Sequence, residues 1–136
     1  KLLVGDGLGP KIGQIDNSAR TEYGTLIDRN VSTGPLSNQG LNFFINQLEV
    51  TTESGVGTTL PPDENPQITM SMSVDGGHTF GNELSRALGK IGEYNQRQIW
   101  RRLGRVSRFA MFNFSVSAEV TPVIIKLEAD IESGSQ

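Results

Sequence analysis

Residues 73–80, Ser-Val-Asp-Gly-Gly-His-Thr-Phe, predict one tight β-hairpin turn. An aspartate in a turn accepts hydrogen bonds from backbone amides two or three residues later, and glycine adopts positive φ at no steric cost. The run fits the turn motif Ser-x-Asp-x-Gly-x-Thr-aromatic, called an Asp box, with its defining residues at Ser73, Asp75, Gly77, Thr79 and Phe80. We therefore expect a β-hairpin here, and we assign the motif an architectural role rather than a catalytic one.

Period-two alternation of apolar side chains predicts the strands around this turn. The alternation is clean at 67–73 and at 109–117, and the strongest strand signal lies at 123–131. Residues 41–54 form the longest β-rich run of the first half. Both faces of that run begin apolar and become polar, which is typical of a strand that leaves the core part-way. Weaker signals are present at 11–16, 25–32 and 80–88.

These segments, with turn signals roughly every 8–12 residues, predict an all-β fold of antiparallel sheets. A closed β-propeller needs at least about four blades, more than this chain can supply. A β-sandwich, or a partial β-propeller built from hairpins, fits better. We expect a single all-β domain over residues 1–136, with its candidate internal boundary in the Pro- and Gly-rich loop 54–66. A short helix at 82–88 is the alternative to a strand returning from the Asp box.

Composition limits the chemistry. The chain has no cysteine, which excludes a disulfide framework and cysteine-based metal sites. Its formal net charge of −3 gives no overall attraction to nucleic acid. No apolar run approaches the roughly 18 residues of a membrane-spanning helix. Hydrophobic residues make up only 35% of the chain, which predicts a thin core or one completed by neighbours.

Catalytic and metal-binding patterns are weak. His78, the single histidine, lies at the turn tip without a partner at metal-ligand spacing. A serine–histidine site would need His78 buried beside a serine and a carboxylate, which the spacing does not indicate. Sialidases also carry Asp boxes, and paired carboxylates can hydrolyse glycosides. The nearest acidic groupings, Asp63-Glu64 and Glu128 with Asp130, resemble a loop and a solvated strand face. We expect no enzyme activity, metal or cofactor.

A basic run from 90 to 108 is the second notable feature. It contains six of the chain's twelve Lys and Arg residues against one acid, Glu93. The six are Lys90, Arg97, Arg101, Arg102, Arg105 and Arg108. Such a run is usually a solvated strand face whose arginines pair with carboxylates of neighbouring strands or subunits. The alternative is contact with a polyanion such as DNA. Trp100, within the run, is expected to anchor a core or an interface.

Three motifs in order resemble one family of phage proteins. SVDGGHTF (73–80) is followed by LGKIGEY (88–94) and IWRRLGR (99–105), and the upstream run IGQIDNSARTEYGTLIDR (12–29) is also similar. The order and spacing resemble the C-terminal part of the packaged-DNA stabilisation proteins, or tail hub (nozzle) proteins, of short-tailed bacteriophages. Phe80 stands where that family usually has Trp.

The resemblance implies a non-catalytic virion component, made in the cytoplasm of the bacterial host as part of a longer tail protein. Such proteins form a ring, sixfold in that family, below the portal and adaptor proteins. The ring extends the channel for packaged double-stranded DNA, retains the genome and docks tail fibres or a needle. The basic run would then line the DNA path or contact the next subunit. The alternative is a carbohydrate- or receptor-binding β-domain, for which the candidate aromatic platforms are Tyr23, Tyr94 and Trp100.

Overall fold

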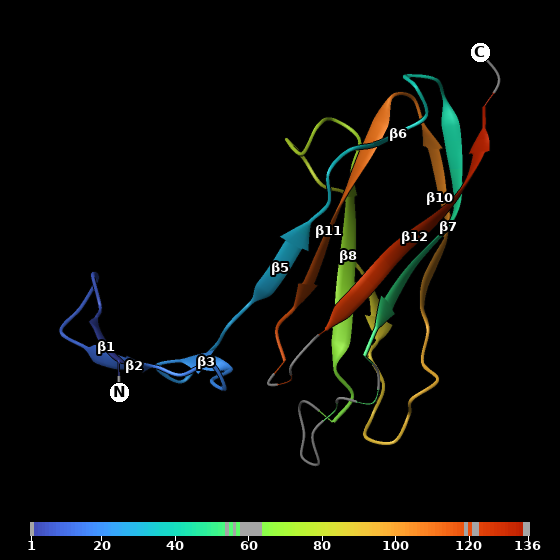
Figure 1. Cartoon of the computed structure of the whole chain (residues 1–136). Helices are drawn as coiled ribbons and strands as arrows, with labels where there is room; N and C mark the ends of the chain where they lie inside the picture. Colours follow the sequence, from blue (N-terminus) through green and yellow to red (C-terminus); the bar gives the residue numbers. More distant parts are fainter. Residues whose placement is uncertain are drawn as a thin grey trace.

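The protein is all-β, and most of it is a β-sandwich (Figure 1). The computed structural model describes residues 2–53, 55, 57, 64–118, 120 and 123–134. Within these residues there are twelve strands and no helix, so none that could cross a membrane. The strands are β1 (Leu2–Gly5), β2 (Ile12–Ile15), β3 (Thr21–Glu22), β4 (Thr25–Leu26), β5 (Arg29–Ser32), β6 (Leu36–Ser37), β7 (Phe43–Thr52), β8 (Gln67–Ser73), β9 (Leu84–Ala87), β10 (Gln98–Val106), β11 (Phe109–Val116) and β12 (Ile124–Ser133).

Two antiparallel sheets form the sandwich. The first has the order β10-β7-β12, and the second has the order β5-β11-β8-β9 with β6 also paired to β11. Strands β5 and β6 lie one after the other along β11, separated by Thr33, Gly34 and Pro35. Thr33 bridges that break, because its amide donates to the carbonyl of Phe112 (2.8 Å) and its hydroxyl accepts from the Phe112 amide (3.0 Å).

The core lies between the two sheets. Strand β11 alternates as the sequence predicts, with every second side chain buried. The buried apolar residues are Phe43, Ile45, Leu48, Val50, Ile68, Met70, Leu88, Trp100, Val106, Ala110, Phe112, Phe114, Val116, Ala118 and Val120. Burial of this apolar surface is the main favourable term for folding.

Strand β7 differs from the prediction that it leaves the core part-way. Phe43 and Ile45 are buried at its start, and Leu48 and Val50 are buried near its end. The buried face changes from odd to even positions at Asn46, where the register shifts against both β10 and β12. A β-bulge inserts one residue and so reverses the alternation. The bulge keeps the whole strand on the core, and it explains why both faces carry apolar residues.

Polar side chains tie the two sheets together at one end of β10. Gln98 is buried, but its amide donates to the carbonyl of Ala87 (3.0 Å) and accepts from the Thr52 hydroxyl (2.8 Å). The indole of Trp100 donates to the carbonyl of Leu84 (3.0 Å). Buried polar groups are stable only when satisfied in this way. These bonds fix β9 against β10.

Several short elements differ from the sequence expectations. The alternative of a helix at 82–88 is wrong, because residues 84–87 form strand β9. The strand expected at 25–32 is divided into β4 and β5, and strands β1, β3 and β6 were not predicted. Most of the loop 54–66, the candidate internal boundary, lies outside the described residues.

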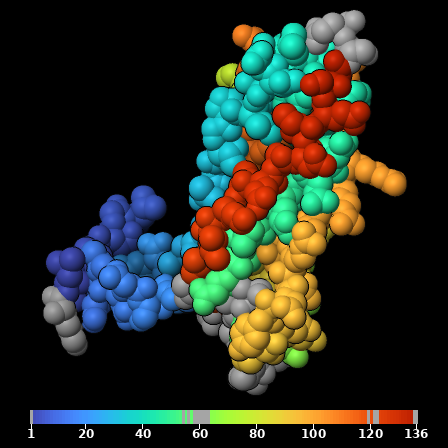
Figure 2. Space-filling model, turned by 45° about the vertical axis from the view of Figure 1, so that its right-hand side comes forward, coloured from blue at the N-terminus to red at the C-terminus, as the bar shows by residue number. Residues whose placement is uncertain are grey.

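Residues 2–27 form an arm that projects from the side of the sandwich (Figures 1 and 2). It consists of two hairpins, β1 with β2 and β3 with β4. Leu8 is 99% exposed and Ile12 is 77% exposed, so the arm presents apolar side chains to solvent. Two-stranded hairpins of this kind are marginally stable by themselves.

Strand β12 is exposed along its whole length, although it pairs with β7 throughout. Figure 2 shows it as a band crossing the surface of the molecule. Its inner face borders two open cavities, of about 530 and 370 Å³, that separate it from β5 and β6. The segment before β12 is held by Arg29, whose guanidinium donates to the carbonyls of Ala118 and Val120.

Candidate functional site

The Asp box forms the turn between β8 and β9. The Ser73 hydroxyl donates to Asp75 (2.7 Å) and accepts from the amide of Gly77 (2.9 Å). Asp75 also accepts from the amide of Thr79 (2.9 Å) and from its hydroxyl. Gly77 has a φ of 89°, a conformation that favours glycine. Phe80, the aromatic residue that ends the motif, keeps 40% of its surface exposed and is not part of the core.

The same bonds set the charge state of the turn. The hydrogen bond from the Thr79 side chain, followed by those from the Thr79 amide and the Ser73 hydroxyl, holds the pKa of Asp75 well below its usual range. Such a carboxylate is a fixed acceptor and a poor general acid. His78 is exposed at the tip of this turn. Among the described residues, no group of three or more potential ligands could hold a metal ion.

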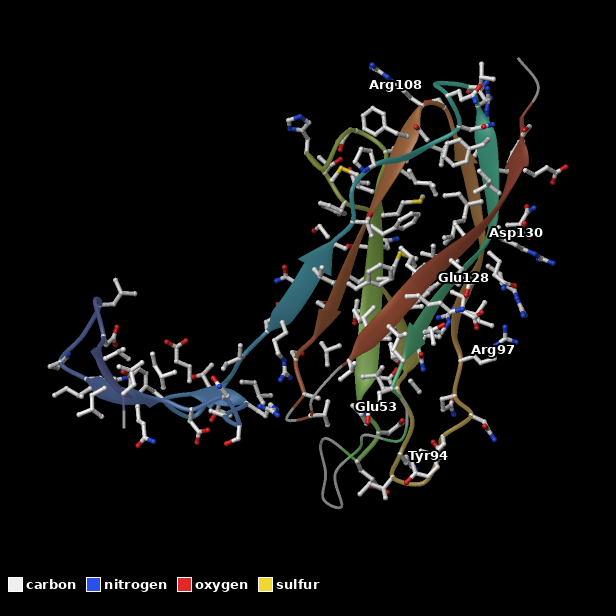
Figure 3. All side chains as sticks on the ribbon, viewed as in Figure 1. Glu53, Tyr94, Arg97, Arg108, Glu128 and Asp130 are labelled. Atoms are coloured by element: carbon white, nitrogen blue, oxygen red, sulfur yellow. The ribbon has the colours of Figure 1, made fainter. Side chains whose placement is uncertain are left out.

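The two ends of the basic run lie in loops flanking β10. Lys90 precedes β10, and its amine is 3.9 Å from the Glu64 carboxylate. Arg108 lies in the turn between β10 and β11, with its guanidinium 5.5 Å from the Phe109 ring (Figure 3). These two residues are therefore at opposite ends of the strand rather than in one cluster.

Arg97 and Arg101 project from the outer face of the first sheet. Arg97 makes a two-pronged contact with Glu49 of β7 (2.8 and 3.1 Å), and this contact holds the pKa of Glu49 below its ordinary value. Arg101 donates to the side-chain oxygen of Gln47 (3.3 Å). Gln47 is neutral, so this contact leaves the charge of Arg101 uncompensated.

A second bulge shapes the middle of β10. The register against β7 shifts between Arg101 and Gly104. Arg102 has a φ of 56° and Gly104 a φ of 93°. Two consecutive arginines, Arg101 and Arg102, are thereby exposed, while Leu103 packs against the core. The motif IWRRLGR thus encodes a backbone irregularity as well as a charge.

Arg105 completes the basic edge, the name used here for Arg101, Arg102 and Arg105 of β10. With the Asn42 amide oriented to donate to the carbonyl of Ser107, its oxygen accepts a hydrogen bond from Arg105 (2.7 Å). Asn42 is also neutral. The basic edge is a row of solvent-facing cations along one border of the first sheet.

The opposite border of this sheet is acidic, whereas the sequence alone indicates only a solvated strand face at Glu128 and Asp130. The acidic edge consists of Glu128, Asp130 and Glu132 of β12, and Figure 3 shows Glu128 and Asp130 on the same side as Arg97. Lys126 pairs with Glu128 (2.6 Å). Alternation identified Glu128 and Asp130 as outward-facing, but only the sheet order places the acidic edge across β7 from the arginines.

The candidate aromatic platforms do not converge. Trp100 is fully buried. It therefore anchors the core, one of the two roles expected for it, and offers no exposed platform. Tyr94 is 72% exposed in the loop before β10, whereas Tyr23 lies in the arm beside Lys11. These three side chains therefore form no common surface of the kind that binds sugars.

Comparison with known proteins identifies the family. The family described as "Bacteriophage P22 Gp10, beta-sandwich" matches residues 28–132, which is more than half of the chain and coincides with the sandwich. No curated protein matches the chain significantly. The description agrees with the two-sheet architecture and with the resemblance found in the sequence motifs. The chain belongs to the bacteriophage P22 Gp10 β-sandwich family, and thus to the structural proteins of phage tails.

Proposed function

We propose that this chain is a subunit of the tail hub, or nozzle, of a short-tailed phage. Six copies form a ring below the portal and adaptor proteins, and the ring extends the channel through which packaged DNA leaves. The basic edge of β10 is the observation that carries this proposal, supported by the family match over the sandwich.

The basic edge is suited to contact with an anionic partner. Arg101 and Arg105 contact neutral amides, so their charges remain available. Strand β10 keeps them in a fixed row, and the bulge adds Arg102. A ring repeats this row once per subunit, which sums weak local potentials into a strong one at the channel. Lys or Arg residues near DNA phosphates release counterions and retain the nucleic acid without reading its sequence.

The arm is suited to docking other parts of the tail. Its hairpins expose apolar side chains and project from the sandwich, outside the segment that the family match covers. Apolar surface of this kind is usually buried against a partner. Portal, adaptor, fibre or needle proteins are the partners that the tail setting offers.

The test removes charge from the basic edge without changing the backbone. Arg102→Gly fits the positive φ of this position, and combined with Arg101→Ala it removes two cations. Phage carrying the double variant should lose packaged DNA, measured as nuclease-sensitive genome and a reduced infectious titre. Lys90→Ala combined with Arg108→Ala removes the same charge from the two loops flanking β10, outside the basic edge, and is the matched control.

The outcomes separate retention from assembly. Tails that contain the protein but leak DNA would support a DNA-retaining channel. Tails without the protein would assign the basic edge to assembly instead. Particles that contain the double variant and hold their genome as tightly as wild type would refute a role in DNA retention.

A further inference from the structure

Strand β12 has the features of an interface that the isolated chain leaves open. All of its residues are exposed, yet it carries the apolar residues Ile125, Leu127 and Ile131. It is a border strand, paired with β7 on one side only. A long border strand with exposed apolar residues is a template for contact with another chain.

The two borders of the first sheet are complementary in charge, position by position. Gln47 pairs in register with Arg101 on one side and with Asp130 on the other. Phe44 pairs in register with Arg105 and with Glu132 in the same way. Each of these two rows therefore runs from a cation at the β10 border to an anion at the β12 border.

These charges are not consumed within the sheet. Among the described residues, the ion pairs on this face are Arg97–Glu49 and Lys126–Glu128, and neither joins β10 to β12. The cation and the anion of each row are separated by two strand spacings of about 4.8 Å each. The complementary groups lie too far apart for direct contact inside one chain.

We propose that the acidic edge of one copy docks against the basic edge of the next, with Asp130 beside Arg101 and Glu132 beside Arg105. The proposal rests on the proposed function for the ring itself, because it names the contact between neighbouring subunits. It assigns Arg101 and Arg105 to that contact, and it leaves Arg102 as the cation of the basic edge that is available to DNA. Docking would also cover part of the exposed apolar surface of β12.

The charge pattern requires head-to-tail contact. Two basic edges, or two acidic edges, would bring like charges together, which is repulsive. When the acidic edge of one copy docks on the basic edge of another, the pair still has one free basic edge and one free acidic edge. Further copies can therefore add until the ring closes. The occupant of the β12 border is therefore a second copy of this chain.

Cysteine cross-linking tests the contact directly, because the chain contains no native cysteine. A chain with both Arg101→Cys and Asp130→Cys should give a ladder of disulfide-linked species from assembled tails on a non-reducing gel. Two cysteines about two strand spacings apart in one chain exceed the roughly 7 Å limit for a disulfide. The single variants Arg101→Cys and Asp130→Cys are matched controls and should remain uncross-linked.

Several results would overturn the inference. Tails that contain the double-cysteine protein but show only monomer refute the contact and leave the proposed function standing. Dimers from either single variant would show contact between like edges instead. Absence of the wild-type protein from tails would refute both the contact and the proposed function.

Charge reversal provides an independent readout. Arg101→Glu with Arg105→Glu, or Asp130→Arg with Glu132→Arg, should each lower the ring fraction about tenfold or more. All four changes in one chain reverse both edges and should restore the ring. Failure of this restoration in a chain that melts like wild type would refute the pairing.

Discussion

Strands β10 and β12 flank the same central strand, yet only β10 contributes to the core. β10 buries Gln98, Trp100 and Val106, whereas β12 buries none of its residues. Both are long and both follow β7 in register over most of their length. The difference lies in what faces them, since β10 is tied to β9 and β12 borders open cavities. Hydrogen-bonded pairing places a strand in a sheet, but burial depends on the opposite layer.

The largest test of this contrast compares one apolar residue from each strand. Trp100→Ala should lower the free energy of unfolding by about 3–5 kcal/mol, because it leaves a cavity and removes the bond to Leu84. Leu127→Ala in β12 should cost about 1 kcal/mol or less, because Leu127 is 36% exposed. Urea denaturation followed by circular dichroism measures both. Equal losses would mean that β12 is packed more tightly than its exposure indicates.

If Trp100→Ala does not fold, Trp100→Phe keeps an aromatic ring in the core. It leaves the Leu84 carbonyl without its donor and should cost about 1–3 kcal/mol. An unchanged free energy of unfolding in Trp100→Phe would argue against the hydrogen bond from the Trp100 indole to the Leu84 carbonyl.

A smaller effect is expected at the β10 bulge. Gly104→Ala should cost about 1–2 kcal/mol through its positive φ, since no atom lies within 4 Å of the added Cβ. The free energy of unfolding of Arg102→Gly should remain within about 0.5 kcal/mol of wild type. Glycine relieves the strain of the positive φ (56°), and this gain offsets the conformational entropy that glycine adds to the unfolded chain. Thermal melts provide the comparison. An unchanged melting temperature in Gly104→Ala would mean that the bulge rearranges without a loss of stability.

The smallest effect distinguishes the two borders by pH. Arg97 lowers the pKa of Glu49, so this contact is complete above the ordinary glutamate pKa and is lost as pH falls through the lowered value. Glu128 raises the pKa of Lys126, so that contact is complete below the ordinary lysine pKa and is lost as pH rises through the raised value. Acid should therefore perturb the β10 side, and alkali the β12 side.

NMR titration of the Glu49 carboxyl measures the acid half of this prediction. Arg97→Gln should move its midpoint up toward the ordinary glutamate value, while Lys126→Gln should move it much less. An unchanged midpoint in Arg97→Gln would show that the pair seen here does not persist in solution.

The sequence predicts the strongly patterned elements and the turn chemistry. The strands at 67–73, 109–117 and 123–131 are confirmed, as is the burial of alternate residues in β11. These follow from local alternation, which one sequence displays. The all-β class and the sandwich alternative are confirmed with them.

What the sequence does not reveal depends on contacts between distant segments. The bulge at Asn46 reverses the buried face of β7, and its position is set by the partners β10 and β12. The exposure of β12 depends on the cavities that separate it from the opposite sheet. The alignment of Arg101 with Asp130 depends on both registers through Gln47, so the basic run alone could not identify its complement.

Arg29 gives the last strand an unusual kind of attachment. Its guanidinium donates to two carbonyls ahead of β12. The strand itself is then held by the ladder to β7 and, near its end, by side-chain bonds from Asn46 to Glu132 and from Asn38 to Ser133. Since none of its residues is buried, β12 should open more easily than the strands that carry the core. Hydrogen exchange should find its amides opening before those of β8 and β11, and the freed flank of β7 would then be the place where misassembly begins.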